Sequence, residues 1–364
     1  MRNFLAGLVF MVGASSAQGQ SGELADLAAQ TLDASGAPAV GVMRLEGGEP
    51  AIGVAGFRAF RGDAPVSEDD LWHMGSNTKA MTAVLVARLV EQGVVRWEDT
   101  VTGYLGPHIE DIDPSYANVT FLHLLSHRSG LRANVNNVDM IRFGVRGASD
   151  EPITEQRLDY ARRVLTETPQ VSIEDEFLYS NAGYVVVGAM LEAATGESWE
   201  ALMRREVFLP LGLESAGFGA PGSSEAVDQP RGHRGGMFGG LTAVEPGPAA
   251  DNPPVLGPAG TVHLSLGDLA VYLDVVMAGM RGEETDFLSA ESWQLIATPP
   301  YGGDYALGWG VQGDQRLHAG SNTMWFVQIV IEPETDSAAV VAFNDGRINR
   351  LQPAMVEAVQ ALLD

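Results

Sequence analysis

Ser76 and Lys79 are two residues whose types and spacing could do covalent chemistry. Lys79 is the only lysine in the sequence, and all the other basic side chains are arginine. An ammonium group can lose its proton when it is removed from water, whereas a guanidinium group cannot. The lone lysine therefore indicates a site that needs a neutral amine, for instance to take a proton from a serine hydroxyl. Because serine is common, the spacing alone is also compatible with coincidence.

The segment 76–92 is predicted to form a central helix, because its apolar residues recur at helical spacing and it carries few charges. Gly93 follows as a plausible C-cap. Side chains three residues apart share one face of a helix, so Ser76 and Lys79 would be neighbours near its start. The positive end of the helix and burial both favour a neutral lysine. The pair therefore fits the serine–lysine version of an activated nucleophile.

Two further segments carry groups that such a nucleophile would need. Tyr179 and Asn181 precede an expected helix. A phenol can pass a proton to or from the serine, and an asparagine amide can bind a substrate amide. His318, Gly320 and Ser321 end an expected strand, whose edge could supply a backbone N–H to an oxyanion hole. Gly320 would let a substrate approach the backbone closely.

Taken in this order, Ser-x-x-Lys, Tyr-x-Asn and a His-x-Gly strand resemble the β-lactamase and penicillin-binding serine hydrolase family. The match is to the branch with Tyr-x-Asn, which holds class C β-lactamases, D-alanyl-D-alanine carboxypeptidases, D-aminopeptidases and related esterases. The segments 120–131, 257–260 and 322–325 also resemble family segments. The resemblance therefore spans nearly all of the chain that follows the first 17 residues.

The resemblance implies a role for each matching position. Ser76 would be the nucleophile, Lys79 the proton acceptor, and Tyr179 the acid/base partner in acylation and deacylation. Asn181 would bind substrate, and the backbone N–H groups of Ser76 and Ser321 would form the oxyanion hole. No metal or cofactor is expected.

The third motif departs from the family pattern. Penicillin-binding proteins have Lys-Thr-Gly or His-Thr-Gly there, and this chain has His318, Ala319 and Gly320. A neutral imidazole holds a carboxylate less firmly than an ammonium does, and Ala319 lacks a hydroxyl that could have helped. The departure favours the esterase and D-aminopeptidase relatives over relatives that bind a free carboxylate.

We therefore expect an enzyme: a serine hydrolase that cleaves an amide or ester through an acyl-serine intermediate. Its substrate would be a small molecule, such as a peptide, D-amino acid amide, β-lactam or carboxylic ester. One alternative is a true class C β-lactamase or DD-carboxypeptidase. Another is a non-catalytic protein that keeps the fold to bind cell-wall peptides, although such a binder would not need a lone lysine.

The first 17 residues read as a secretory signal, with Arg2 before an apolar stretch and small residues up to Ala17. Cleavage after Ala17 would leave a periplasmic or secreted protein, and no later segment is predicted to enter a membrane stably. The net charge of −25 argues against nucleic acid or anionic lipid as a partner. The chain has no cysteine, which excludes disulfides and thiolate metal sites.

Two other patterns have structural interpretations. His123 and His127 have the spacing of a metal pair, but no carboxylate or third ligand lies nearby as in a His-Glu-x-x-His site. We therefore expect them to orient the turn at Ser129 and Gly130. Ser265 with Asp268 three residues later is predicted to be a helix N-cap.

The expected fold is α/β (α+β), with an antiparallel sheet built from both chain ends, flanking helices, and an inserted, mainly helical region. Residues 18–75 with 301–364 would form the sheet domain and 76–300 the helical domain, with the active site at their junction. Strands are predicted at 39–45, 51–55, 307–311, 316–318, 324–331 and 338–343, and helices at 21–35, 76–92, 154–168, 182–195, 198–208, 266–280, 290–297 and 347–363. The Gly/Pro-rich stretch 217–262 is expected to be loops.

Overall fold

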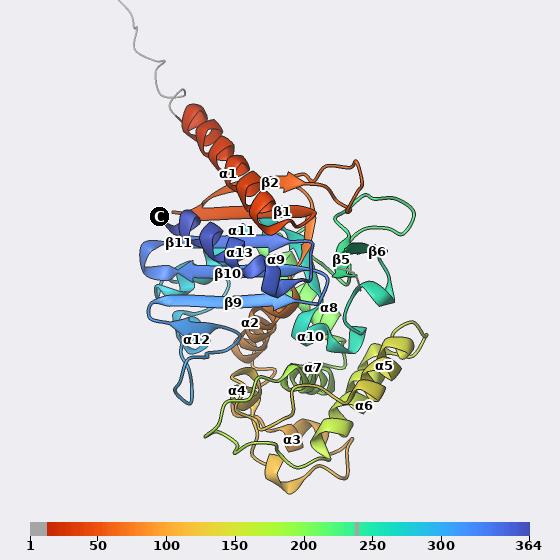
Figure 1. Cartoon of the computed structure of the whole chain (residues 1–364). Helices are drawn as coiled ribbons and strands as arrows, with labels where there is room; N and C mark the ends of the chain where they lie inside the picture. Colours follow the sequence, from red (N-terminus) through yellow and green to blue (C-terminus); the bar gives the residue numbers. More distant parts are fainter. Residues whose placement is uncertain (1–12, 237–239) are drawn as a thin grey trace, which may run out of the picture.

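Strands from both ends of the chain lie side by side in one antiparallel sheet (Figure 1). The computed structural model describes residues 13–236 and 240–364. The predicted sheet built from the two chain ends is therefore confirmed, as is the mixed α/β fold with many helices. Most of the predicted signal segment, residues 1–12, lies outside the described residues.

The strands are β1 (Ala39–Glu46), β2 (Glu49–Gly56), β3 (Leu71–His73), β4 (Gly217–Phe218), β5 (Gly232–Gly235), β6 (Leu241–Val244), β7 (Val262–Ser265), β8 (Gly310–Gln312), β9 (Gln315–Ser321), β10 (Phe326–Glu332) and β11 (Ser337–Phe343). The α-helices are α1 (Gly13–Ser35), α2 (Thr78–Glu91), α3 (Val101–Leu105), α4 (Phe121–Leu125), α5 (Asn137–Arg146), α6 (Ile153–Leu165), α7 (Asn181–Thr195), α8 (Trp199–Met203), α9 (Leu209–Leu211), α10 (Gly257–Gly260), α11 (Leu266–Met280), α12 (Ala290–Ala297) and α13 (Ile348–Leu363). Short 3-10 turns are η1 (Gly75–Asn77), η2 (Pro114–Tyr116), η4 (Pro248–Ala250), η5 (Pro254–Leu256) and η6 (Pro333–Thr335), and η3 (Arg204–Phe208) is a π turn.

The large sheet has the strand order β2-β1-β11-β10-β9-β8. Its hairpin β1–β2 turns at Gly47 and Gly48, whose φ angles of 58° and 79° suit the tight turn that matches strand twist. Side chains alternate between the two faces of each strand. On β11, Val341 and Phe343 pack with α1 and α13, while Val340 and Ala342 join the larger core shared with the helical part. The sheet is thus buried on both faces.

Helix α2 lies between the sheet and the helical part of the molecule (Figure 1). Nearly all its side chains are buried, which explains why its sequence carries so few charges. Its first turn follows directly from β3 through η1. Ser76 and Lys79 therefore lie just before and within the first turn of a largely buried helix.

Two sequence predictions differ from the structure. The strand expected at 307–311 is displaced to β8, because Gly308 has a φ of 83° and a Cβ there would lie 2.6 Å from the Ala80 Cα, so the chain bends tightly against α2. The stretch 217–262 is not all loop, since β5 pairs with β6 and β7 pairs with both β3 and β4. The N-cap at Ser265 is confirmed by its side chain, which accepts from the Asp268 N–H at 3.1 Å.

None of the helices in the described part of the chain combines the length and apolar character that a membrane span needs.

Arg157 on α6 joins several helices at the centre of the helical part. Its side chain is fully buried, donates to Glu192 of α7, and reaches Glu200 of α8 at 2.7 Å. It also donates to the backbone carbonyls of Pro254 and Val255, which lead into α10. A buried guanidinium that donates to two carboxylates and two backbone carbonyls is well satisfied. Without the guanidinium, the two carboxylates would lose their cation.

We expect Arg157→Met to lower the free energy of unfolding by about 3–5 kcal/mol, because it leaves the Glu192 carboxylate buried without a cation. Urea unfolding followed by circular dichroism measures the change. Arg205→Met is the matched control: Arg205 is exposed and pairs with Glu197 and with the buried Glu206, which also accepts from Gln92, so its loss should cost below about 1 kcal/mol. Adding Glu192→Gln to Arg157→Met should recover part of the loss; equal costs for the two arginine substitutions would contradict this account.

Candidate active site

Ser76 lies in the turn η1 between β3 and α2, directly after Gly75. Gly75 has a φ of 52°, and a Cβ there would lie 2.3 Å from the backbone nitrogen of Ser321. Any other residue would be strained and would collide with β9. The turn that carries Ser76 therefore rests directly on the end of β9, which brings the two expected oxyanion-hole residues together.

Lys79 is fully buried in the first turn of α2. Its Nζ lies 3.1 Å from the Ser76 Oγ, 2.7 Å from the Asn181 Oδ1 and 2.7 Å from the carbonyl oxygen of Ala259. Burial lowers the pKa of the Lys79 amine well below its ordinary value. These contacts join three segments far apart in sequence at a single nitrogen.

A neutral Lys79 amine can form a hydrogen bond with each of these three oxygens. The amide oxygen of Asn181 and the carbonyl oxygen of Ala259 can only accept, so they take its two N–H groups. The lone pair is then left for the Ser76 hydroxyl, which can donate. The same three oxygens could also hold an ammonium, but burial shifts the balance toward the neutral amine.

Tyr179 lies beside the same pair. Lys79 Nζ lies 5.0 Å from the centre of the Tyr179 ring. Burial raises the pKa of the Tyr179 phenol to about 12, and hydrogen bonding with Ser76 offsets part of that rise. At neutral pH the phenol is therefore protonated and can donate.

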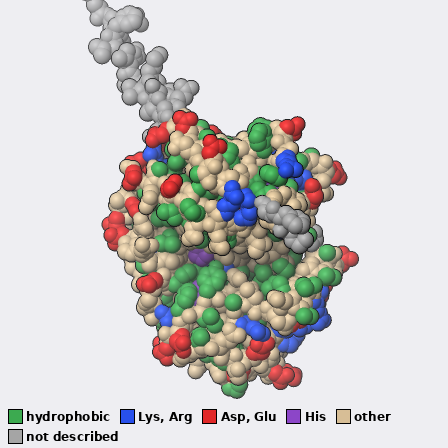
Figure 2. Space-filling model, in the orientation of Figure 1, with side chains coloured by type: hydrophobic (Ala, Val, Ile, Leu, Met, Phe, Trp, Pro, Cys, Tyr) green, Lys and Arg blue, Asp and Glu red, His purple; other side chains and the backbone are tan. Residues whose placement is uncertain are grey.

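Asn181 begins α7, where the side chain of Ser180 caps the helix by accepting from the Gly183 N–H. While its oxygen accepts from Lys79, its Nδ2 donates to the Asn134 Oδ1 at 3.1 Å. Asn134, which was not predicted, comes from a loop with no motif that could have pointed to it. Together with Asn322 these amides line a pocket of about 380 Å³. Figure 2 shows a hollow across this face, with a histidine and hydrophobic side chains in it.

His318, Gly320 and Ser321 lie on β9, as predicted, in register with β10. The space over Gly320 is filled by the turn that carries Ser76, since a Cβ there would lie 1.9 Å from the carbonyl oxygen of Met74. Packing of this turn thus explains why the residue is a glycine, and the expected approach of a substrate to Gly320 stays a prediction. The Ser321 side chain accepts from the Thr323 N–H and donates to the Trp325 carbonyl, so it shapes the end of the strand.

His318 is buried, and its surroundings keep it neutral. Burial is the main cause that lowers the pKa of His318 to about 3. Its Nε2 lies 3.1 Å from the hydroxyl of Tyr305. Tyr305 also packs on the ring of His127, and no sequence pattern had indicated either contact.

The histidine pair of 123 and 127 has separate structural roles. His127 is fully buried, accepts from the Ser180 N–H at 3.0 Å, and packs on the Tyr179 ring at 4.2 Å. His123 bonds to Thr120 at the start of α4. Within residues 13–236 and 240–364, no group of three or more His, Asp or Glu side chains is arranged to hold a metal ion. The contacts of His127 with Ser180 and Tyr179 indicate that it orients Tyr179 in addition to the turn that it was expected to orient.

Curated relatives share part of this sequence. Penicillin-binding protein 4 of Amycolatopsis lactamdurans is 28% identical over 64% of this chain and 57% of its own length. Unguisins hydrolase ungD' of Aspergillus campestris is 26% identical over 88% of this chain and 61% of its own length. Esterase EstB of Burkholderia gladioli is 31% identical over 42% of this chain and 40% of its own length. The chain thus matches between two fifths and three fifths of the length of these relatives.

Solved structures share the fold at low sequence identity. The structure of SurE has a TM-score of 0.74 at 23% identity and covers 96% of this chain and 77% of its own. The octameric penicillin-binding protein homologue from Pyrococcus abyssi has a TM-score of 0.71 at 22% identity, covering 92% of this chain and 76% of its own. The model of one family, described as Beta-lactamase, matches residues 24–363. The chain therefore belongs to the Beta-lactamase family.

Proposed function

We propose that the protein is an exported serine hydrolase that cleaves an amide or ester bond through an acyl-serine intermediate. The observation that carries the proposal is the buried Lys79 amine, 3.1 Å from the Ser76 hydroxyl, with its N–H groups directed to other acceptors. Membership of the Beta-lactamase family and relatives named as an esterase and a hydrolase support it.

In the proposed reaction, Lys79 takes the proton of Ser76 as the serine oxygen attacks the substrate carbonyl carbon. The negative charge that forms on the carbonyl oxygen would be held by the backbone N–H groups of Ser76 and Ser321. Tyr179, protonated at neutral pH, delivers a proton to the leaving group as its bond to the carbonyl carbon breaks. Water then attacks the acyl carbon and gives a proton to the Tyr179 phenolate. The bond between the acyl carbon and the Ser76 oxygen breaks, Lys79 returns its proton to Ser76, and the acid product leaves.

The chemistry around His318 favours substrates without a carboxylate at that position. A buried imidazole with a lowered pKa carries no charge to hold a carboxylate, and Tyr305 occupies its Nε2. Simple esters and D-amino acid amides are therefore proposed ahead of β-lactams and D-Ala-D-Ala peptides. Export to the periplasm or medium is proposed from the signal-like residues 1–17.

Incubation with a labelled fluorophosphonate should modify Ser76, because the lysine beside it makes this hydroxyl the reactive one. Peptide mass mapping identifies the labelled residue, and Ser76→Ala is expected to remove both the label and a p-nitrophenyl acetate burst. A folded protein that carries no label on Ser76 would refute the hydrolase proposal and leave a binding protein as the better account.

Parallel assays with nitrocefin, short-chain esters and D-amino acid amides decide the substrate class. Turnover of esters or amides is expected. Nitrocefin turnover that disappears in Ser76→Ala would instead support the class C β-lactamase alternative.

Lys79 should titrate far below an ordinary lysine, and activity should follow its deprotonation. A protonated lysine cannot accept the serine proton, so kcat/KM falls as pH drops through the lowered pKa and is retained above it. Because Lys79 is the only lysine, ¹³C-lysine labelling gives one side-chain NMR signal whose titration measures this pKa directly.

Lys79→Arg keeps the charge but removes the proton acceptor, so kcat should fall by about 10²–10⁴-fold. Arg44→Lys on β1, away from the site, is the matched control and should leave kcat unchanged while adding a second lysine signal with an ordinary pKa. A Lys79 signal that titrates near 10.5, or full turnover by Lys79→Arg, would show that another group is the base.

A further inference from the structure

A buried histidine holds the turn that precedes the nucleophile. His73, the last residue of β3, is fully buried and stacks on the Trp325 ring at 5.5 Å. Its Nδ1 accepts a hydrogen bond from the backbone N–H of Gly75 at 3.1 Å. A ring nitrogen that accepts from a backbone N–H carries no proton, which places the ring proton on Nε2.

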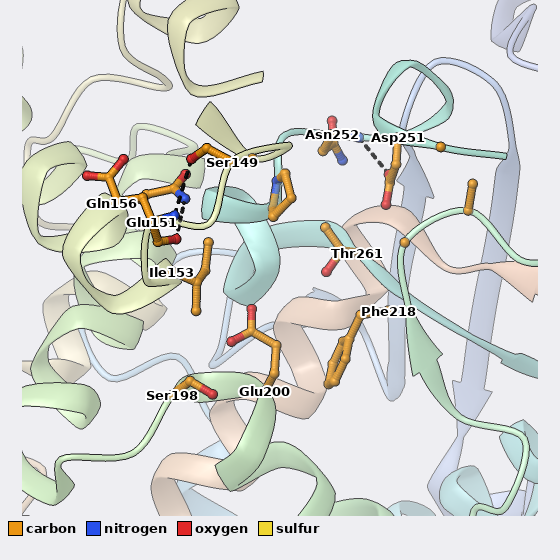
Figure 3. Close-up of a pocket in the computed structure, with 15 residues that line it drawn as sticks. Ser149, Glu151, Ile153, Gln156, Ser198, Glu200, Phe218, Asp251, Asn252 and Thr261 are labelled. Carbon is orange, nitrogen blue, oxygen red and sulfur yellow. Dashed lines mark hydrogen bonds between the residues drawn. The ribbon is translucent and has the colours of Figure 1, made fainter. Parts of the chain in front are cut away.

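Asp251 faces that second nitrogen. Its Oδ1 lies 2.8 Å from the His73 Nε2, a close contact that lacks hydrogen-bond geometry, and its side chain is only 6% exposed. The carboxylate comes from the loop before α10 and forms part of the wall of a cavity of about 600 Å³, where Figure 3 shows it next to Asn252. The backbone N–H of Asn252 donates to the same oxygen at 2.6 Å.

The same oxygen also binds the end of the facing strand. The Asn322 Nδ2 donates to the Asp251 Oδ1 at 2.9 Å. The Asn322 oxygen in turn accepts from the backbone N–H groups of Met324 and Trp325 at 3.1 Å each, which fixes the turn after β9. Asn322 directly follows Ser321, just as Gly75 directly precedes Ser76. One carboxylate oxygen thus contacts a side chain next to each of the two backbone segments that would bind the oxyanion.

We propose that Asp251 is a positioning residue that sets the spacing of the oxyanion hole through His73 on one side and Asn322 on the other. The inference rests on the proposed hydrolase function and extends it to residues that do not touch the reacting atoms. Its physical basis is that two backbone N–H groups must point at one developing charge, and a displacement of about 1 Å costs about 10²-fold in rate. A shared buried carboxylate, in close contact with His73 and hydrogen-bonded to Asn322, limits how far the two backbones can separate.

The test uses Asp251→Ala, Asp251→Asn and the control Glu245→Gln in the full chain. Glu245 lies in the same connecting region but is an exposed acid paired with Arg231. Asp251→Ala should lower kcat for p-nitrophenyl acetate by about 10- to 100-fold with KM within about twofold, since substrate contacts remain. Asp251→Asn, which keeps an acceptor oxygen for Asn322, should lose less. Glu245→Gln should match the wild type.

Phenylboronic acid provides the readout that a merely structural residue would not change. It adds to a serine hydroxyl as a tetrahedral anion, so its inhibition constant reports the oxyanion hole in correctly folded molecules. Asp251→Ala should weaken this inhibition in parallel with kcat, whereas Asp251→Asn should retain more of it. Fluorophosphonate labelling counts the active sites, so that unfolded protein is not mistaken for a rate effect.

Each outcome has a distinct meaning. If the wild type labels on Ser76 and Asp251→Ala keeps both kcat and boronate affinity, the positioning role is wrong and the hydrolase function stands. If the wild type carries no label on Ser76, the hydrolase proposal fails and this inference fails with it. If Asp251→Ala does not fold, the Asp251→Asn variant decides the question. The positioning role is supported if kcat and the affinity for phenylboronic acid both fall in this variant. The role is wrong if only the fraction of labelled protein falls.

Discussion

A buried amine without a carboxylate partner is the constraint on which this structure depends. Lys79 is fully buried, and within the described residues its Nζ is satisfied by a hydroxyl, an amide oxygen and a carbonyl oxygen. Such a group is costly to bury and stays in place only because the surrounding backbone is fixed. The fold therefore has to hold α2, the start of α7 and α10 within hydrogen-bonding distance of a single nitrogen.

The segment 251–261 is what holds these elements together. Its Pro258 carbonyl accepts from the Thr82 hydroxyl one turn along α2 from Lys79, at 2.8 Å. Its first residue, Asp251, contacts His73, which precedes the turn with Ser76. Arg157 of α6 donates to the carbonyl of Val255 in the middle of the segment. The same segment thus contacts Lys79, the turn that carries Ser76, and the centre of the helical part. A Gly/Pro-rich sequence suits this role because it must present backbone carbonyls as well as side chains.

Sequence reasoning reached the residues that carry local patterns. The hairpin at 39–56, the central helix after Ser76 and the two-ended sheet follow from periodicity and turn glycines, and the structure has them. Contacts across long sequence separations carry no such pattern: Asn134 meets Asn181, and Asp251 meets His73, only after folding. The packing of Gly320 could not be foreseen for the same reason, because the neighbour that fills the space over it comes from the turn near Met74.

The electrostatics of surface and site point in the same direction. A net charge of −25 repels anionic small molecules in solution, and the neutral His318 removes the local charge that could have held a carboxylate. Arg234 and Asp251 also line the pocket, and the Arg234 guanidinium donates to the Ala249 carbonyl. Asn134 and Asn181 line the same pocket, and side-chain amides can recognise neutral carbonyl and N–H groups. A neutral ester or amide can approach and bind without the desolvation of a charge, and this suits the proposed role of Lys79 as a base that works only while it is uncharged.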